Sequence, residues 1–213
     1  MKVLVLPDTH IPYHDRDCLS AWISRARSIR PDVVVSIGDL VDMYAVSTHE
    51  RDPRRVLTLQ QEITQAREII GRIREVSPRF VVLEGNHERR LYRYLMRHPE
   101  LMSLECLTIP SLLGLDDYRH HVEIDGVMYV HGDVVSAQAG AAAHRMSAKT
   151  AMPTVVGHTH RLALVHRRVG ASGCTWAAES GCLCNLDPDY VWMPDWQHGW
   201  VVVDSGRPSL ETP

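Results

Sequence analysis

The first half of the chain contains runs of apolar residues that do not alternate with polar ones. Val3–Leu6, Val33–Ile37 and Phe80–Leu83 are such runs, and this pattern is typical of strands buried on both faces of a sheet. The stretches between them have helical periodicity. Asp15–Ile29 opens with acidic residues, and Val56–Val76 repeats apolar residues every three or four positions. The pattern predicts parallel strands joined by crossover helices.

The second half has a different pattern, with short runs that predict strands and few helices between them. A hairpin is expected where Val122–Ile124 and Val127–Val130 flank Asp125-Gly126. Helices are expected at Glu88–Arg97 and Ala137–Ala148. The remaining strands are expected at Thr154–Val156, Leu162–Arg168, Thr175–Glu179 and Trp200–Val203. We therefore predict an α/β fold of two packed mixed β-sheets flanked by helices, an α/β/β/α sandwich, in a single domain over residues 1–213.

The composition of the chain limits the kinds of binding partner and the cellular compartment to be expected. The 213 residues carry 23 Lys and Arg against 26 Asp and Glu, a net charge of −3, so no global charge attracts a polyanion or a membrane surface. The apolar start of the chain is too short for a signal peptide, and no segment reaches the roughly 20 apolar residues of a spanning helix. The five cysteines are an odd number in a chain large enough to fold without disulfides, which favours the cytoplasm.

Five short polar clusters follow apolar runs along the chain. They are Pro7-Asp8-Thr9-His10, Gly38-Asp39, Gly85-Asn86-His87-Glu88, His131-Gly132 and Gly157-His158-Thr159-His160. Each polar residue alone has an ordinary explanation as a turn residue or a hydrogen-bonded histidine. Together they place carboxylate, amide and imidazole groups at several strand ends, a ligand set that suits hard or intermediate metal ions. If the strands stay extended, residues two positions apart, such as Asp8 and His10, leave the same face and can reach one ion.

The order and spacing of these clusters resemble the calcineurin-like metallophosphoesterases, whose signature is D-x-H, G-D, G-N-H-E, a single H and G-H-x-H. The resemblance runs from Asp8 to His160. It implies two divalent metal ions, with Mn²⁺ expected and Fe or Zn²⁺ as alternatives. It assigns one ion to Asp8, His10, Asp39 and His160, and the other to Asp39, Asn86, His131 and His158.

The resemblance also implies a phosphoester substrate and a reaction in which a hydroxide bridging the two ions attacks phosphorus. Asp39 would then be catalytic as the bridging ligand. His87 directly follows Asn86, and in the resembled family this histidine faces the substrate. We expect His87 to protonate the leaving oxygen or to stabilise its charge. The alternative is an orienting histidine that is hydrogen-bonded to a carboxylate.

One departure from the family pattern bears on the substrate. Serine/threonine phosphoprotein phosphatases continue the G-D cluster into D-R-G, whose arginine grips a phosphomonoester, whereas this chain has Asp42-Met43-Tyr44. We therefore expect phosphodiester hydrolysis of cyclic or small nucleotides or of nucleic acid. Phosphomonoester hydrolysis on nucleotides or phosphoproteins is the alternative within enzymes, and a non-catalytic scaffold is the alternative outside them. Other arginines could replace this cation, and the alternative is that they only form a solvated helix face. They are Arg89, Arg90, Arg51, Arg54 and Arg55.

Three further segments leave alternatives open. Trp192, Trp196 and Trp200 recur every fourth residue, and core packing is favoured over stacking on a base. The stretch Pro188–Gly199, together with Gly85-Asn86-His87-Glu88-Arg89, resembles small metallophosphoesterases of bacteria and phages. Leu104–Leu115 could be a lid, a contact in an oligomer or ordinary core. A structural or inert role is favoured over zinc binding for the cysteines Cys174, Cys182 and Cys184.

Overall fold

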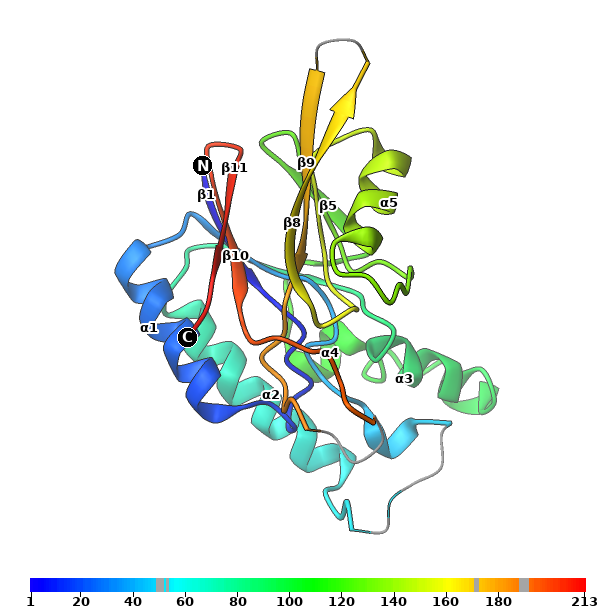
Figure 1. Ribbon diagram of the computed structural model, residues 1–213. Helices are drawn as coiled ribbons and strands as arrows, with labels where there is room; N and C mark the ends of the chain where they lie inside the picture. The colour runs from blue at the N-terminus through cyan, green and yellow to red at the C-terminus, as the bar shows by residue number, and fades with distance from the viewer. Residues whose placement is uncertain (49–51, 53, 171–172, 188–191) are drawn as a thin grey trace.

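The first of two β-sheets carries the parallel strands of the first half of the chain. The computed structural model describes residues 1–48, 52, 54–170, 173–187 and 192–213 (Figure 1). The strand order in this sheet is β11-β10-β1-β2-β3-β4, in which β1 to β4 are parallel and β10 and β11 are antiparallel. The strands are β1 (Lys2–Leu6), β2 (Val33–Ser36), β3 (Phe80–Leu83), β4 (Tyr118–Arg119), β10 (Trp200–Asp204) and β11 (Arg207–Glu211).

The second sheet is mixed, with the order β5-β6-β7-β9-β8. Here β6, β7 and β9 are parallel, whereas β5 and β8 pair antiparallel to their neighbours. The strands are β5 (His121–Ile124), β6 (Val127–Val130), β7 (Thr154–Val156), β8 (Leu162–Val169) and β9 (Gly173–Ser180). The expected hairpin at Asp125-Gly126 is present as the β5–β6 turn.

Helices cover the outer faces of both sheets. α1 (Arg16–Ile29) and α2 (Leu59–Arg74) pack on the first sheet, and α5 (Ala141–Thr150) packs on the second (Figure 1). The shorter helices are α3 (Glu88–Leu95), α4 (Ile109–Leu113) and the 3₁₀ turns at Tyr44–Val46 and Pro99–Leu101. None of the described helices is both long and apolar enough to cross a membrane.

Alternate residues of the buried strands serve two different cores. Val3 and Val5 of β1 pack against the second sheet, in a cluster that includes Tyr129. Leu4 and Leu6 point the other way, into the core beneath α1 and α2. Because both faces of β1 are covered, the strand is apolar throughout, as its sequence predicted. The predicted fold of two mixed sheets flanked by helices is therefore confirmed.

Several predicted boundaries need correction. α2 begins at Leu59 instead of Val56, because Thr58 caps the helix in a reciprocal pair with Gln61 and Val56 lies 79% exposed before it. α5 begins at Ala141 instead of Ala137, since Gly140 before it has a left-handed backbone. α3 ends at Leu95 instead of Arg97.

The structure also settles part of the segment Leu104–Leu115. Its second half forms α4, in which Ile109 and Leu113 are buried in the core beneath α2. Its first residue, Leu104, is exposed. The apolar residues of the second half are therefore ordinary core.

Candidate metal centre

The predicted ligands come from strand ends at one edge of both sheets. Asp8 follows β1, Asp39 follows β2 and Asn86 follows β3 in the first sheet. His131 follows β6 and His158 follows β7 in the second sheet. Parallel strands send their carboxyl ends to the same edge, so packing two such sheets face to face brings both sets of loops together.

A first group of ligand atoms is formed by Asp8, His10, Asp39 and His160, and these atoms lie within 4.8 Å of one another. The Nε2 atoms of His10 and His160 are 3.0 Å apart. His160 Nε2 is also 3.1 Å from Asp8 Oδ2, and His10 Nε2 is 3.7 Å from Asp39 Oδ2. All four residues are buried.

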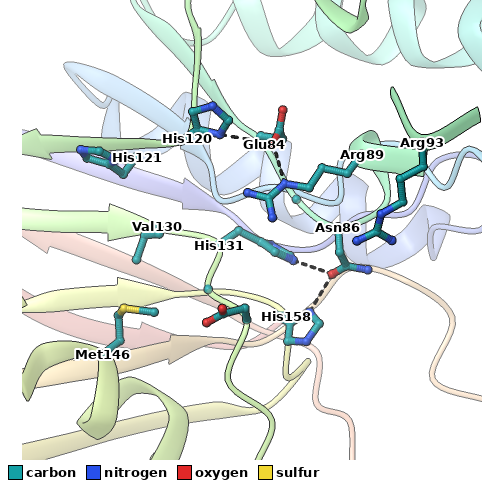
Figure 2. Close-up of a pocket in the computed structure, with 13 residues that line it drawn as sticks. Glu84, Asn86, Arg89, Arg93, His120, His121, Val130, His131, Met146 and His158 are labelled. Atoms are coloured by element: carbon teal, nitrogen blue, oxygen red, sulfur yellow. Dashed lines mark hydrogen bonds and ion pairs between the residues drawn. The ribbon is translucent and has the colours of Figure 1, made fainter. Parts of the chain in front are cut away.

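A second group is formed by Asp39, His131 and His158, again within 4.8 Å, with Asn86 between the two histidines (Figure 2). The amide oxygen of Asn86 is 3.0 Å from His131 Nε2 and 2.7 Å from His158 Nδ1. His131 Nε2 is 3.4 Å from Asp39 Oδ2. Asp39 therefore belongs to both groups, which brings together all seven residues of the expected ligand set.

The chemistry of the two groups fits divalent cations. Asp8 Oδ1 is buried and has no hydrogen-bond partner among the described residues, a costly arrangement for a carboxylate unless a cation balances it. Burial opposes the charge on Asp39, but the neighbouring histidines, His131 first, hold the pKa of its carboxyl well below its usual range. The carboxylate thus stays ionised. His131 Nδ1 lies 3.2 Å from the carbonyl oxygen of Ile37, and its Nε2 faces Asp39 Oδ2 at 3.4 Å.

The backbone at the ligands is not extended, which corrects the expectation made for the paired residues. His10, Asp39, His158 and His160 have φ angles of 49°, 50°, 69° and 57°, in the left-handed region. This region is uncommon for residues other than glycine and is concentrated at functional sites. Turned backbone therefore directs the ligands, and His158 and His160 join different groups.

Glycines before two of the ligands allow this close packing. A β-carbon at Gly85 would collide with the side chain and backbone of Asp39. Gly38 has a φ of 107°, and a β-carbon there would lie 2.7 Å from His131 Nδ1. The G-D and G-N-H-E clusters need their glycines for these reasons.

His87 lies beside the first group and contacts carboxylates. Its ring centroid is 4.3 Å from that of His10, its Nδ1 is 3.3 Å from Asp42 Oδ2, and its Nε2 is 3.8 Å from Asp39 Oδ2. Burial disfavours the charged ring, but the carboxylates of Asp39 and Asp42 outweigh it and raise the pKa of His87. The carboxylate contact expected for an orienting histidine is therefore present. The leaving-group role stays a prediction.

The cations named as replacements for the missing arginine have different surroundings. Arg90 binds Asp42 at 3.0 Å, and Arg89 binds Glu84 at 2.6 Å. Arg54 binds Asp52 at 2.7 Å, and Arg51 lies outside the described residues. Arg55 packs over the rings of Tyr13 and Tyr44, at 4.5 and 4.8 Å from their centroids.

Position 43 itself does not face the site. Met43 is fully buried in the core beneath α1 and α2, and its backbone N–H donates to Glu62. The arginine of the D-R-G pattern therefore has no counterpart facing the site at this position. A charged side chain there would be buried among apolar ones.

Sequence reasoning missed the carboxylates that hold the ligand loops together. Glu88 accepts the backbone N–H groups of Asp39 and Gly85 at 3.0 and 2.8 Å, and burial raises the pKa of its carboxyl to about 7. Glu179 accepts the Thr159 hydroxyl at 3.1 Å and the Ala142 N–H of α5 at 3.1 Å. Glu88 stands in the G-N-H-E cluster and could have been found there, whereas no local signal marks Glu179.

Cysteine and tryptophan side chains cover His160. Cys184 Sγ is 3.7 Å from His160 Nδ1, and the ring of Trp196 lies edge-on with centroids 4.3 Å apart. Trp200 is buried in the core, as favoured, but Trp192 is 89% exposed. Part of the stretch Pro188–Gly199, residues 188–191, lies outside the described residues.

Two cavities adjoin the centre on different sides. The larger, of about 380 Å³, is lined by Asn86, His131 and His158 of the second group (Figure 2). The smaller, of about 60 Å³, is lined by His10, Asp42 and Arg55.

Comparison with known proteins gives the family. The Gene 54 protein of Mycobacterium phage L5 is 28% identical over 226 residues, which cover 95% of this chain and 88% of that protein. Vps29 from Entamoeba histolytica, solved in complex with Zn²⁺, has a TM-score of 0.53 at 14% identity, over 99% of this chain and 97% of that one. The phosphoesterase YfcE of E. coli has a TM-score of 0.51 at 14% identity, over 96% of this chain and 88% of that one.

The two solved structures show that the fold is shared. A model of the family described as calcineurin-like phosphoesterases matches residues 1–193, a range that contains all the residues of both ligand groups. This protein therefore belongs to the calcineurin-like phosphoesterase family.

Proposed function

We propose that the protein is a phosphoric ester hydrolase with a dinuclear metal centre that favours phosphodiesters of nucleotides or nucleic acid. The observation that carries the proposal is Asp39, whose carboxylate belongs to both ligand groups. A carboxylate has two oxygens and can bridge two cations. Such a pair of ions supplies charge neutralisation and an activated water near neutral pH.

The chain's own residues divide the remaining work. Asn86 and His158 border the larger cavity, where a phosphoester can approach the centre. His87 Nδ1 lies 3.0 Å from the carbonyl oxygen of Asp42, and its Nε2 lies 3.1 Å from the guanidinium of Arg90. We assign His87 to the leaving oxygen, with Arg90 beside it to balance developing negative charge.

Charge compensation supports the preference for diesters. Arg89 and Arg90 are each paired with a carboxylate, at 2.6 and 3.0 Å, so neither offers a full charge to a dianion. A diester carries one negative charge and a monoester approaches two at neutral pH. A pocket with compensated cations should therefore lose more affinity for the monoester.

The complete ligand set counts against a scaffold role. A chain kept only for its shape has no need of seven convergent ligands, four of them in left-handed backbone that costs about 1–3 kcal/mol per residue. The five cysteines are unpaired, which is consistent with a reducing compartment such as the cytoplasm.

The test compares the variant Asp39→Asn with the wild type under saturating Mn²⁺. We expect the variant to lose turnover of bis-p-nitrophenyl phosphate and to retain less metal by elemental analysis. Asp17→Asn, on the exposed face of α1, is the matched control. Two tightly held ions in folded Asp39→Asn protein would refute the bridging role.

Substrate preference is tested on the wild type. We expect kcat/KM for bis-p-nitrophenyl phosphate to exceed that for p-nitrophenyl phosphate by about tenfold, since charge-assisted contacts contribute roughly 1.5–3 kcal/mol each. A strong preference for the monoester would refute the diester assignment, and Arg55 at the smaller cavity would be the first source of the extra cation to examine.

A further inference from the structure

The larger cavity extends well beyond the ligand atoms. Its volume of about 380 Å³ falls in the range of small-molecule sites, roughly 300–1,000 Å³. Asn86, His131 and His158 form one wall, and the start of β5, the end of β6, α3 and α5 form the others (Figure 2). A scissile phosphate at the centre would fill only the end of this space.

The far walls combine apolar and polar surface. Val130 of β6 and Met146 of α5 supply an apolar side, and His120 and His121 lie across from α3 (Figure 2). A nucleoside has an apolar base face and polar edges, so its surface matches walls of this kind.

Two charged groups in the cavity have no partner within the described residues. Arg89 is compensated by Glu84 at 2.6 Å, but Arg93 makes no hydrogen bond or ion pair in the part of the chain that the structure describes. The same is true of Asp133 on another wall, within those described residues. An unpaired guanidinium favours an anionic group, and an unpaired carboxylate favours a hydrogen-bond donor such as a sugar hydroxyl or a base amine.

Helix geometry places Arg93 one turn beyond Arg89. Residues four apart on a helix lie on the same face, about 5–6 Å from each other. Long side chains on a helix point back towards its N-terminus, and Arg93 extends from α3 towards Asn86 (Figure 2). Arg93 therefore faces the cavity at a distance from the centre that suits a second group of the substrate.

We propose that the larger cavity is a subsite for the nucleotide next to the scissile bond, in which Arg93 contacts a second phosphate and Asp133 accepts from the sugar or base. This inference rests on the proposed phosphodiesterase function and names its substrate class. The substrate is a nucleotide chain with at least two phosphates, and a nitrophenyl diester would leave the subsite empty.

The first test measures hydrolysis of the thymidine dinucleotide TpT and of its terminally phosphorylated forms pTpT and TpTp. We expect the wild type to prefer one phosphorylated form by about tenfold in kcat/KM, the effect of one charged contact. Arg93→Gln should abolish this preference. Arg97→Gln, just beyond α3 and outside the cavity, should keep the preference.

The second test measures binding and needs no turnover. A fluorescein-labelled thymidine octanucleotide is titrated by anisotropy into each protein in EDTA at several salt concentrations. Arg93→Gln should weaken binding and reduce the slope of log affinity against log salt by about 0.7, the value for one phosphate contact on a single strand. Binding of the octanucleotide that exceeds binding of labelled pTpT identifies a nucleic-acid strand, and equal binding identifies a small nucleotide.

The outcomes separate the two proposals. If diesters are hydrolysed but Arg93→Gln behaves like Arg97→Gln in both tests, the subsite is refuted and the proposed function stands. If no diester is hydrolysed but Arg93→Gln alone weakens binding, the subsite stands and the proposed function fails. Equal weakening by both variants would mean a diffuse charge effect and would refute the subsite.

Discussion

The two ligand groups are built from the same kinds of side chain but differ in their access to solvent. Asp8, His10 and His160 of the first group are buried, and His160 is covered by Trp196 and Cys184. Asn86, His131 and His158 of the second group line a cavity of about 380 Å³. A closed group can hold an ion but leaves little room for exchange, whereas an open group can also meet a substrate. The two groups therefore differ in how readily a ligand from solvent can reach them.

The largest effect on metal affinity should come from removing one histidine from each group, His160 from the first and His158 from the second. His160→Ala leaves the buried Asp8 carboxylate without its contact at 3.1 Å. His158→Ala opens onto the cavity, where water can replace the imidazole. We expect His160→Ala to lower Mn²⁺ affinity by more than the 10–100-fold typical of outer contacts, and His158→Ala to lower it less. Titration with a competing metal indicator measures both.

The prediction for these two variants needs a folding control. Thermal unfolding shows whether each variant is folded before its metal affinity is measured. If folded His158→Ala lost as much affinity as folded His160→Ala, burial would not distinguish the two groups.

The next effect concerns His87, which lies beside the closed group. A general acid typically contributes ~10²–10⁴ in rate. We expect His87→Ala to lose this factor on substrates with a ribose leaving group and much less on nitrophenyl esters, whose leaving group needs no proton. Single-turnover rates on both substrates give the ratio. Equal losses would leave His87 with the orienting role, in line with its contact to Asp42 at 3.3 Å.

A smaller effect is expected from Glu179, which supports both groups through Thr159. Glu179→Ala removes the acceptor of the Thr159 hydroxyl and of a backbone N–H at the start of α5. Loss of such an outer contact costs about 10–100-fold in metal affinity, and a buried donor left unpaired costs about 1–3 kcal/mol. Glu179→Gln retains an acceptor oxygen and is the matched control. Metal affinity and urea unfolding should change together in the alanine variant, and a change in unfolding alone would limit Glu179 to α5.

The last prediction concerns the pH dependence of stability and a residue away from the ligands. Burial raises the pKa of Glu62 from 4.5 to about 8, so the folded protein binds this proton more tightly than the unfolded chain. The contribution to stability is therefore full below pH 4.5 and is lost as pH rises towards 8, by up to about 1.4 kcal/mol per pH unit. Glu62→Gln should flatten this part of the profile in urea unfolding at pH 5, 6.5 and 8. An unchanged slope would show that other groups cause it.

The strands could be predicted from sequence where burial is two-sided. β1 is apolar throughout because it separates two cores. β11 escaped prediction because it is an edge strand with Pro208 and polar residues, and β4 because it has only two residues. Edge strands tolerate proline and polar side chains, so their sequences lack the signal of central strands.

The convergence of the seven candidate ligands could be predicted because each lies just after a recognisable strand, in a short motif. The rest of the site depends on contacts between distant segments. Glu179 lies 20 positions after the Thr159 that it supports, and Trp196 lies 36 after His160. The left-handed backbone at four ligands could not be inferred either, since those residues are not glycine. Such features follow from tertiary packing and not from local pattern.

The placement of the ligands on two sheets has a consequence for folding. Asp8 and Asp39 follow strands of one sheet, and His131 and His160 follow strands or loops of the other, so each group draws on both halves of the chain. An ion bound there would be coordinated by residues from both sheets and would hold the two sheets together. By mass action, a bound ion stabilises the folded protein relative to any state in which the sheets have separated. The stabilisation is about 2.7 kcal/mol when the free metal concentration is a hundred times the dissociation constant. The lifetime of the protein in a cell would then follow the supply of metal.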